Sequence, residues 1–108
     1  KPDYGPRYTY ECIIFANKGR RPVLISGMND VLDYPAISGK LLQHAAEKPV
    51  ELMKNLLTRS CAPGDKLLDP CAGTGPVLAA AKLLRIQALG FEINQDTYNI
   101  ALNRLAET

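Results

Sequence analysis

One stretch of ten residues, 67–76, limits what this chain can fold into more than any other part of it. It reads Leu-Leu-Asp-Pro-Cys-Ala-Gly-Thr-Gly-Pro. The two leucines predict a buried strand, and the glycines at 73 and 75 predict a tight turn. Pro76 suits the first position of a helix, where the backbone amide has no partner in any case. A strand, a glycine turn and a helix in direct succession are typical of an α/β sheet.

A second acidic residue follows at a sequence spacing that is informative about ligand binding. Asp69 ends the first predicted strand, and Glu92 ends the next strand-like run, 23 positions later. Open α/β sheets bind ligands at the carboxyl ends of adjacent strands, and a spacing of roughly 20 residues is typical of an acidic residue that holds ribose hydroxyls. A carboxylate beside the turn favours a cationic ligand over a pyrophosphate. These features predict an S-adenosylmethionine site, with Asp69 near the cationic methionine end and Glu92 at the ribose.

Other interpretations of the same residues fit less well. The third glycine of the dinucleotide pattern would fall at Leu78, so NAD is the weaker candidate. No Gly-Lys-Ser/Thr follows the turn, which excludes a P-loop. Each acidic residue also has a purely structural interpretation, Asp69 as the cap of a turn and Glu92 as a solvent-facing charge. Cys71 is interpreted as a small turn residue rather than as a nucleophile.

The rest of the chain supplies further elements, and together they predict a doubly wound α/β fold. A strand is expected over 8–16, buried on both faces because the residues at 13–15 are all apolar. Residues 20–43 are expected to form a loop that contains a short strand at 23–25. The other expected elements are a helix from Pro49, a strand over 66–68, a helix from Pro76 to 84, a strand over 88–93, and a helix over 96–105 with Tyr98, Ala101, Leu102 and Leu105 facing inward.

Composition is that of an ordinary soluble globular chain. Hydrophobic residues make up 46% of the 108 residues and charged residues 22%, which fits one domain, 1–108, with its own core. No apolar run approaches the roughly 20 residues that span a bilayer, so we expect no membrane association. A net charge of +2 is too small to argue for nucleic acid by itself. Three cysteines without a CxxC pair and a single histidine favour reduced thiols in the cytoplasm and no metal site.

Four segments resemble motifs of the DNA amino-methyltransferases, which methylate the exocyclic nitrogen of adenine or cytosine. Residues 69–75 resemble the D-P-F-x-G-x-G cofactor motif, and residues 90–94, Gly-Phe-Glu-Ile-Asn, resemble the G-x-E-I-N strand end. Residues 44–49, His-Ala-Ala-Glu-Lys-Pro, are similar to the H-P-T-E-K-P segment that precedes the cofactor motif in the permuted branch of the family. Residues 10–15, together with Lys18 and Gly19, are similar to the late strand that precedes the recognition segment.

The resemblance implies a Rossmann-like methyltransferase sheet with helices on its faces, incomplete in this chain, and S-adenosylmethionine as the cofactor. It implies that Glu92 holds the ribose hydroxyls and that Ile93 packs on the adenine ring. It also implies that Lys48 and Pro49 start the helix that walls the methionine end. The residues of the predicted cofactor site at the turn itself are Asp69, Pro70, Cys71, Ala72, Gly73, Thr74 and Gly75.

The chain also departs from the family pattern. Ala46 and Pro76 each stand where the pattern has a threonine. The catalytic tetrapeptide of the family, D-P-P-Y or N-P-P-Y, is absent from the 108 residues. Its role is to bond the target amine and stack the flipped base, so no catalytic residue is predicted and we expect the chain alone to be inactive. The alternative is a non-catalytic module that binds a nucleoside or supports assembly.

Partners follow from the same resemblance. It implies DNA as the substrate of the complete enzyme, methylated at a specific site as in restriction–modification. Residues 20–43 would then be a reduced recognition segment, although Arg20 and Arg21 are equally well explained as an exposed basic loop. In the family sheet, further strands lie between the strands predicted at 8–16 and 66–68. Without them an apolar edge is unprotected, so we expect self-association or pairing with a complementing chain.

Overall fold

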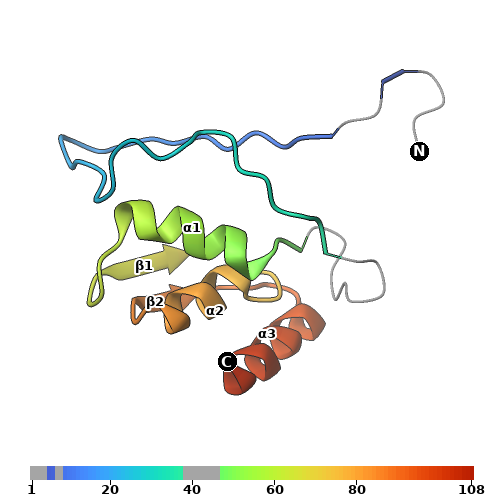
Figure 1. Ribbon diagram of the computed structural model, residues 1–108. Coiled ribbons are helices and arrows are strands. Elements are labelled where there is room, and N and C mark those ends of the chain that lie inside the picture. Colours follow the sequence, from blue (N-terminus) through green and yellow to red (C-terminus); the bar gives the residue numbers. More distant parts are fainter. Residues whose placement is uncertain (1–4, 7–8, 38–46) are drawn as a thin grey trace.

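The computed structural model describes residues 5–6, 9–37 and 47–108, and it contains a two-stranded sheet and three helices (Figure 1). The order helix, strand, helix, strand, helix and the α/β class are confirmed, and Pro76 is the first residue of its helix as predicted. Pro49 is not: its extended backbone, with ψ of 136°, makes it the residue before its helix. The elements are α1 (Val50–Ser60), β1 (Lys66–Asp69), α2 (Pro76–Leu83), β2 (Gln87–Gly90) and α3 (Gln95–Glu107).

The two strands are parallel neighbours, with Asp69 at the end of β1 opposite Gly90 at the end of β2. Backbone pairing continues past the strand ends. The amide of Phe91 donates to the Asp69 carbonyl (3.0 Å), and the amide of Ala72 donates to the Phe91 carbonyl (2.8 Å). The segments that follow β1 and β2 therefore stay side by side at the carboxyl edge of the sheet.

A small apolar core lies between α1, α2 and the sheet. Ala80 and Ala81 of α2 are completely buried, and their short side chains allow α1 to approach closely. Leu57 of α1 and Ile86 before β2 complete the buried cluster. Six partly buried residues pack around this cluster, of which two belong to α1: Val50, Met53, Cys61, Leu67, Val77 and Leu84.

Gly90 is a point of very close packing between the sheet and α2. A Cβ atom at this position would lie 2.5 Å from Cδ1 of Leu78 and 3.1 Å from Cβ of Ala72. Leu78 occupies the space that a side chain at position 90 would need. Leu78 stands where the dinucleotide pattern has its third glycine, so the close approach here is made by a glycine of the sheet and not by one of the helix.

The strand predicted over 8–16 is wrong. Residues 9–16 form irregular extended backbone outside the sheet, while Tyr8 lies outside the described residues. The apolar run at 13–15 is exposed, with Ile14 at 93%. A buried strand needs a neighbour on each side for its backbone groups, and no strand of the described part of the chain pairs with this segment.

The short strand predicted at 23–25 is also wrong, because residues 9–37 contain neither helix nor strand. This segment instead runs along α1 (Figure 1), and the amide of Leu24 donates to the Arg59 carbonyl (2.7 Å). Farther along, Asn55 donates to the hydroxyl of Tyr34 (3.0 Å). Residues 38–43 of the predicted loop lie outside the described residues.

The inward face predicted for α3 is only partly correct. Ala101 is buried against Gly75, and Leu105 is half-buried, whereas Tyr98 and Leu102 are exposed. Among the helices and strands, α3 contacts α2, and the small residues Gly75 and Ala101 meet where α2 begins. The helix therefore buries a narrow stripe of its surface and leaves the rest of its apolar face uncovered.

Candidate functional site

The glycine turn after β1 has the backbone geometry that its sequence predicts. Gly73 and Gly75 have φ angles of 58° and 84°, in the left-handed region that favours glycine. The amide of Gly75 donates to the Ala72 carbonyl (2.9 Å), which closes the turn, and Gly75 is the N-cap of α2. A Cβ atom at Gly73 would meet nothing within 4 Å. The backbone of the turn is therefore open to a ligand at this position.

Asp69 lies at the beginning of this turn. Its Oδ1 accepts a hydrogen bond from the amide of Cys71 (3.2 Å), which is the turn-capping contact of the structural interpretation. The side chain is half-buried, while Pro70 and Cys71 are exposed. The carboxylate thus contributes to the turn and adds negative charge at the carboxyl edge of the sheet.

Glu92 holds the same turn from the segment after β2, since this strand ends at Gly90 and not at 93 as predicted. Its Oε1 accepts from the amide of Gly73 (2.9 Å), and its Oε2 accepts from the amide of Asn94 (2.9 Å). The solvent-facing charge of the structural interpretation is therefore wrong, because Glu92 is bound to the turn. A carboxylate oxygen has two acceptor positions, so each oxygen of Glu92 retains one while its orientation is fixed by two backbone amides.

The two acidic residues predicted for the cofactor meet on one turn. Asp69 bonds Cys71 and Glu92 bonds Gly73, two positions farther along. Ile93 beside them is fully exposed, at 101%. The structure thus brings two carboxylates, an open glycine and an uncovered apolar side chain together at the carboxyl edge of the sheet.

Lys48 and Pro49 lie next to the turn through their neighbour Glu47, whose carboxylate accepts a hydrogen bond from Thr74. Lys48 forms an ion pair with Glu11 of the extended segment (2.8 Å). Thr74 was predicted among the cofactor contacts, but its side chain is buried and its hydroxyl is directed to Glu47. Ala72 is buried as well, at 6%, so the side chains of Ala72 and Thr74 both lie on the inner side of the turn.

Glu47 is the residue that sequence reasoning missed. Its side chain is 0% exposed, and its Oε1 also pairs with the guanidinium group of Arg104 in α3. It precedes α1, so helical periodicity cannot mark it. The only signal in the sequence is its place in the Glu-Lys-Pro part of the segment at 44–49, to which no role was assigned.

Arg21, one of the basic residues considered for DNA phosphates, has a structural role. Its guanidinium group donates to Oδ2 of Asp65 (2.9 Å) and to the Ser60 carbonyl (2.8 Å). The same carboxylate accepts from the amide of Ala62 (2.9 Å). The hydrogen bond from the Ala62 amide is the main cause that holds the pKa of Asp65 below its ordinary value. The charge and the hydrogen bond of Arg21 act in the same direction, and burial opposes them. Arg21 therefore docks the extended segment onto the end of α1.

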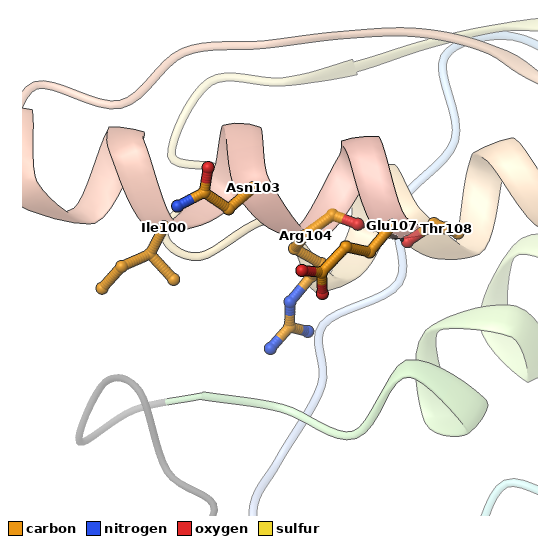
Figure 2. A pocket seen from close by; sticks show the side chains of 5 residues that line it. All are labelled: Ile100, Asn103, Arg104, Glu107 and Thr108. Carbon is orange, nitrogen blue, oxygen red and sulfur yellow. Dashed lines mark hydrogen bonds between the residues drawn. The ribbon is translucent and has the colours of Figure 1, made fainter.

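Two hollows in the described part of the chain are lined by residues outside the glycine turn. One, of about 500 Å³, follows α3, and Figure 2 shows its side chains along that helix, with the guanidinium group of Arg104 extending from it. A second, also of about 500 Å³, lies between residues 27–34 and α1. Among the described residues no group of three or more His, Cys, Asp or Glu could hold a metal ion. No helix in that part of the chain is both long and apolar enough to cross a membrane.

Comparison with known proteins agrees with this geometry. The chain is 47% identical over 62 residues to the Type II methyltransferase M.HindIII of Haemophilus influenzae, which covers 57% of this chain and 20% of that protein. It is similar to the crystal structure of the M1.HpyAVI–SAM complex, with a TM-score of 0.61 and 28% identity over 69% of this chain and 36% of that one. The S-adenosyl-L-methionine complex of TTHA0409, a putative DNA modification methylase from Thermus thermophilus, matches with a TM-score of 0.54 and 38% identity over 56% of this chain and 25% of that one.

The chain thus spans about a fifth of the length of M.HindIII. The family model described as DNA methylase, named for N6 and N4 methyltransferases, matches residues 2–103. This match includes the glycine turn, both acidic residues, all of α1 and α2, and most of α3. With nearly the whole chain matched, this protein belongs to the N6/N4 DNA methylase family.

Proposed function

We propose that this chain binds S-adenosylmethionine at the glycine turn, as the cofactor part of an enzyme that transfers a methyl group to an exocyclic amine of a DNA base. Membership of the DNA methylase family and the S-adenosylmethionine complexes of two similar structures support the proposal. The observation that carries it is the contact between Glu92 and Gly73, because it places a fixed carboxylate of one strand end on the glycine turn of the other.

The residues at the turn fit the cofactor. Glu92 is held by two amides and keeps an acceptor position on each oxygen, which suits the two hydroxyls of a ribose. Ile93 offers an exposed apolar surface for the adenine ring. The open backbone of Gly73 admits the methionine part, whose ammonium and sulfonium charges are attracted by Asp69. In this proposal Lys48 and Pro49 line the methionine end from the segment before α1, next to Glu47, whose carboxylate bonds Thr74.

A nicotinamide dinucleotide fits less well. Its pyrophosphate would meet the carboxylates of Asp69 and Glu92 at the same edge, and like charges at such distances repel. The helix that follows the turn carries Leu78 where the dinucleotide pattern needs a glycine, and Gly90 makes room for that leucine.

We further propose that methyl transfer needs polypeptide beyond these 108 residues. The D/N-P-P-Y tetrapeptide that bonds the target amine is absent from them. The sheet also presents uncovered apolar surface, since Leu68 and its cross-strand neighbour Leu89 are exposed, as is Phe91. Such a surface favours self-association or a complementing chain. A nucleoside-binding or assembly module without catalysis remains the second candidate, supported by the same missing tetrapeptide.

The decisive experiment is a calorimetric titration of the 108-residue chain with S-adenosylmethionine. Glu92→Gln keeps the size of the side chain and removes the charge, and it is expected to weaken binding at least tenfold, since a hydrogen bond to a charged acceptor is worth about 1.5–3 kcal/mol. Glu51→Gln on α1 is the matched control, because Glu51 is exposed and, among the described residues, pairs with the nearby Lys54 alone. It is expected to leave the affinity unchanged.

NAD serves as the competing ligand in the same titration. Binding of NAD in preference to S-adenosylmethionine, or equal affinities for the Glu92→Gln and Glu51→Gln variants, would contradict the proposed site.

A further inference from the structure

Three side chains from distant parts of the chain meet on the inner side of the glycine turn. The hydroxyl of Thr74 donates to Oε1 of Glu47 (2.9 Å), and the guanidinium group of Arg104 pairs with the same oxygen. Glu47 has a side-chain exposure of 0%, and Thr74 is 2% exposed. These three residues, called here the Glu47 cluster, join the residue before Lys48, the turn and α3.

A buried carboxylate is a costly way to join elements that already pack through apolar surfaces. Its desolvation is offset only by close charge pairing and hydrogen bonds, and a well-packed apolar set is often at least as stable. The hydroxyl of Thr74 adds directionality that an apolar contact lacks, because it fixes where the side chain points. The cluster is thus better suited to defining a geometry than to adding stability.

The geometry it defines is that of the turn. Thr74 stands between Gly73 and Gly75, and glycine has more backbone freedom than any other residue. Its side chain is held on the inner side by Glu47, while Glu92 holds the amide of Gly73 on the outer side. Two carboxylates from different elements therefore fix adjacent residues of a turn that would otherwise be free to move.

We propose that Glu47 and Arg104 are positioning residues. They hold Thr74 so that the glycine turn keeps the conformation that receives the cofactor, and neither of them touches the cofactor itself. This inference rests on the proposed function for its consequence in binding, but the restraint on the turn is a property of the ligand-free chain.

The test uses two measurements, affinity for S-adenosylmethionine and hydrogen exchange at the amides of Gly73 and Gly75 without ligand. Thr74→Val removes the hydroxyl at constant shape and is expected to lower affinity about tenfold and to speed exchange at both amides. Thr74→Ser restores the hydroxyl and is expected to recover most of both losses. Thr58→Val is the control, because it removes a hydroxyl bonded within α1, to the Asn55 carbonyl.

Glu47→Gln separates positioning from direct contact. It removes the charge that pairs with Arg104 but keeps an oxygen that can accept from Thr74, so it is expected to weaken binding as well. The loss in Thr74→Val combined with Glu47→Gln is expected to be smaller than the sum of the two single losses, because both residues belong to one cluster. Should Thr74→Val fail to fold, Glu47→Gln carries the same comparison.

Each outcome bears on one proposal. Additive losses in the double variant, equal losses for Thr74→Val and Thr74→Ser, or unchanged exchange in Thr74→Val would overturn the positioning role. If the unmodified chain binds no S-adenosylmethionine, the proposed function fails, and the exchange of the two amides alone decides whether the Glu47 cluster holds the turn.

Discussion

Replacing Gly90 by alanine tests the packing that sets the distance between α2 and the sheet. The added Cβ would lie 2.5 Å from Cδ1 of Leu78, which can rotate, and 3.1 Å from Cβ of Ala72, which belongs to the turn and cannot move alone. Overpacking of this kind costs about 1–3 kcal/mol, while the smaller entropy of the unfolded alanine chain returns about 0.4–1 kcal/mol. The expected result is a net loss of about 1–2 kcal/mol in the free energy of unfolding.

Thermal and urea unfolding of the 108-residue chain measure this loss, which corresponds to a decrease in Tm of roughly 4–16 °C for a domain of this size. The control is Gly5→Ala, where a Cβ meets nothing within 4 Å. Leu78→Ala removes the closest atoms, so Gly90→Ala is expected to cost about 1 kcal/mol less in that background than in the unmodified chain. Equal costs in the two backgrounds, or an unchanged Tm for Gly90→Ala, would refute the reasoning.

Two further predictions concern acid stability and assembly. Folding lowers the pKa of Asp65, so the stabilising effect of this carboxylate is complete at neutral pH and is lost as the pH falls through the folded pKa, below about 4. Asp65→Asn is therefore expected to make the free energy of unfolding fall less steeply between pH 7 and 3. Identical slopes for the variant and the unmodified chain would contradict this. The exposed pair Leu68 and Leu89 predicts self-association, so multi-angle light scattering is expected to give a particle heavier than the 11.8 kDa of one chain. Leu68→Lys is expected to shift the mass toward that of a single chain. An unmodified chain that is strictly monomeric at micromolar concentration would argue against self-association.

The part of the fold that the sequence predicts well is the part with local signals. The apolar run before Asp69, the two glycines and Pro76 define β1, the turn and the start of α2 to within a residue. The contact between Glu92 and Gly73 follows from a general rule, since parallel strands place their carboxyl ends at one edge. Its hydrogen-bond partners do not follow, because they depend on the exact path of the turn.

The features that the sequence did not predict depend on distant partners. The apolar pattern at 13–15 is that of a buried strand, yet it specifies nothing about a neighbour, and in the described part of the chain no strand pairs with it. Tyr98 and Leu102 have helical spacing for an inner face, but burial also requires something to cover them. The pairing of Glu47 with Arg104 joins positions 57 residues apart, which no local pattern can indicate.

The distance in sequence between Glu47 and Arg104 has a consequence for folding during synthesis on the ribosome. Arg104 is synthesised long after Glu47 and Thr74, so the carboxylate cannot acquire its guanidinium partner until α3 has emerged. Until then, enclosing the carboxylate of Glu47 without this cation is more costly, and the inner side of the turn is expected to stay more hydrated. The Glu47 cluster is therefore expected to form only after α3 has been synthesised, and the turn is expected to become fully restrained at that stage.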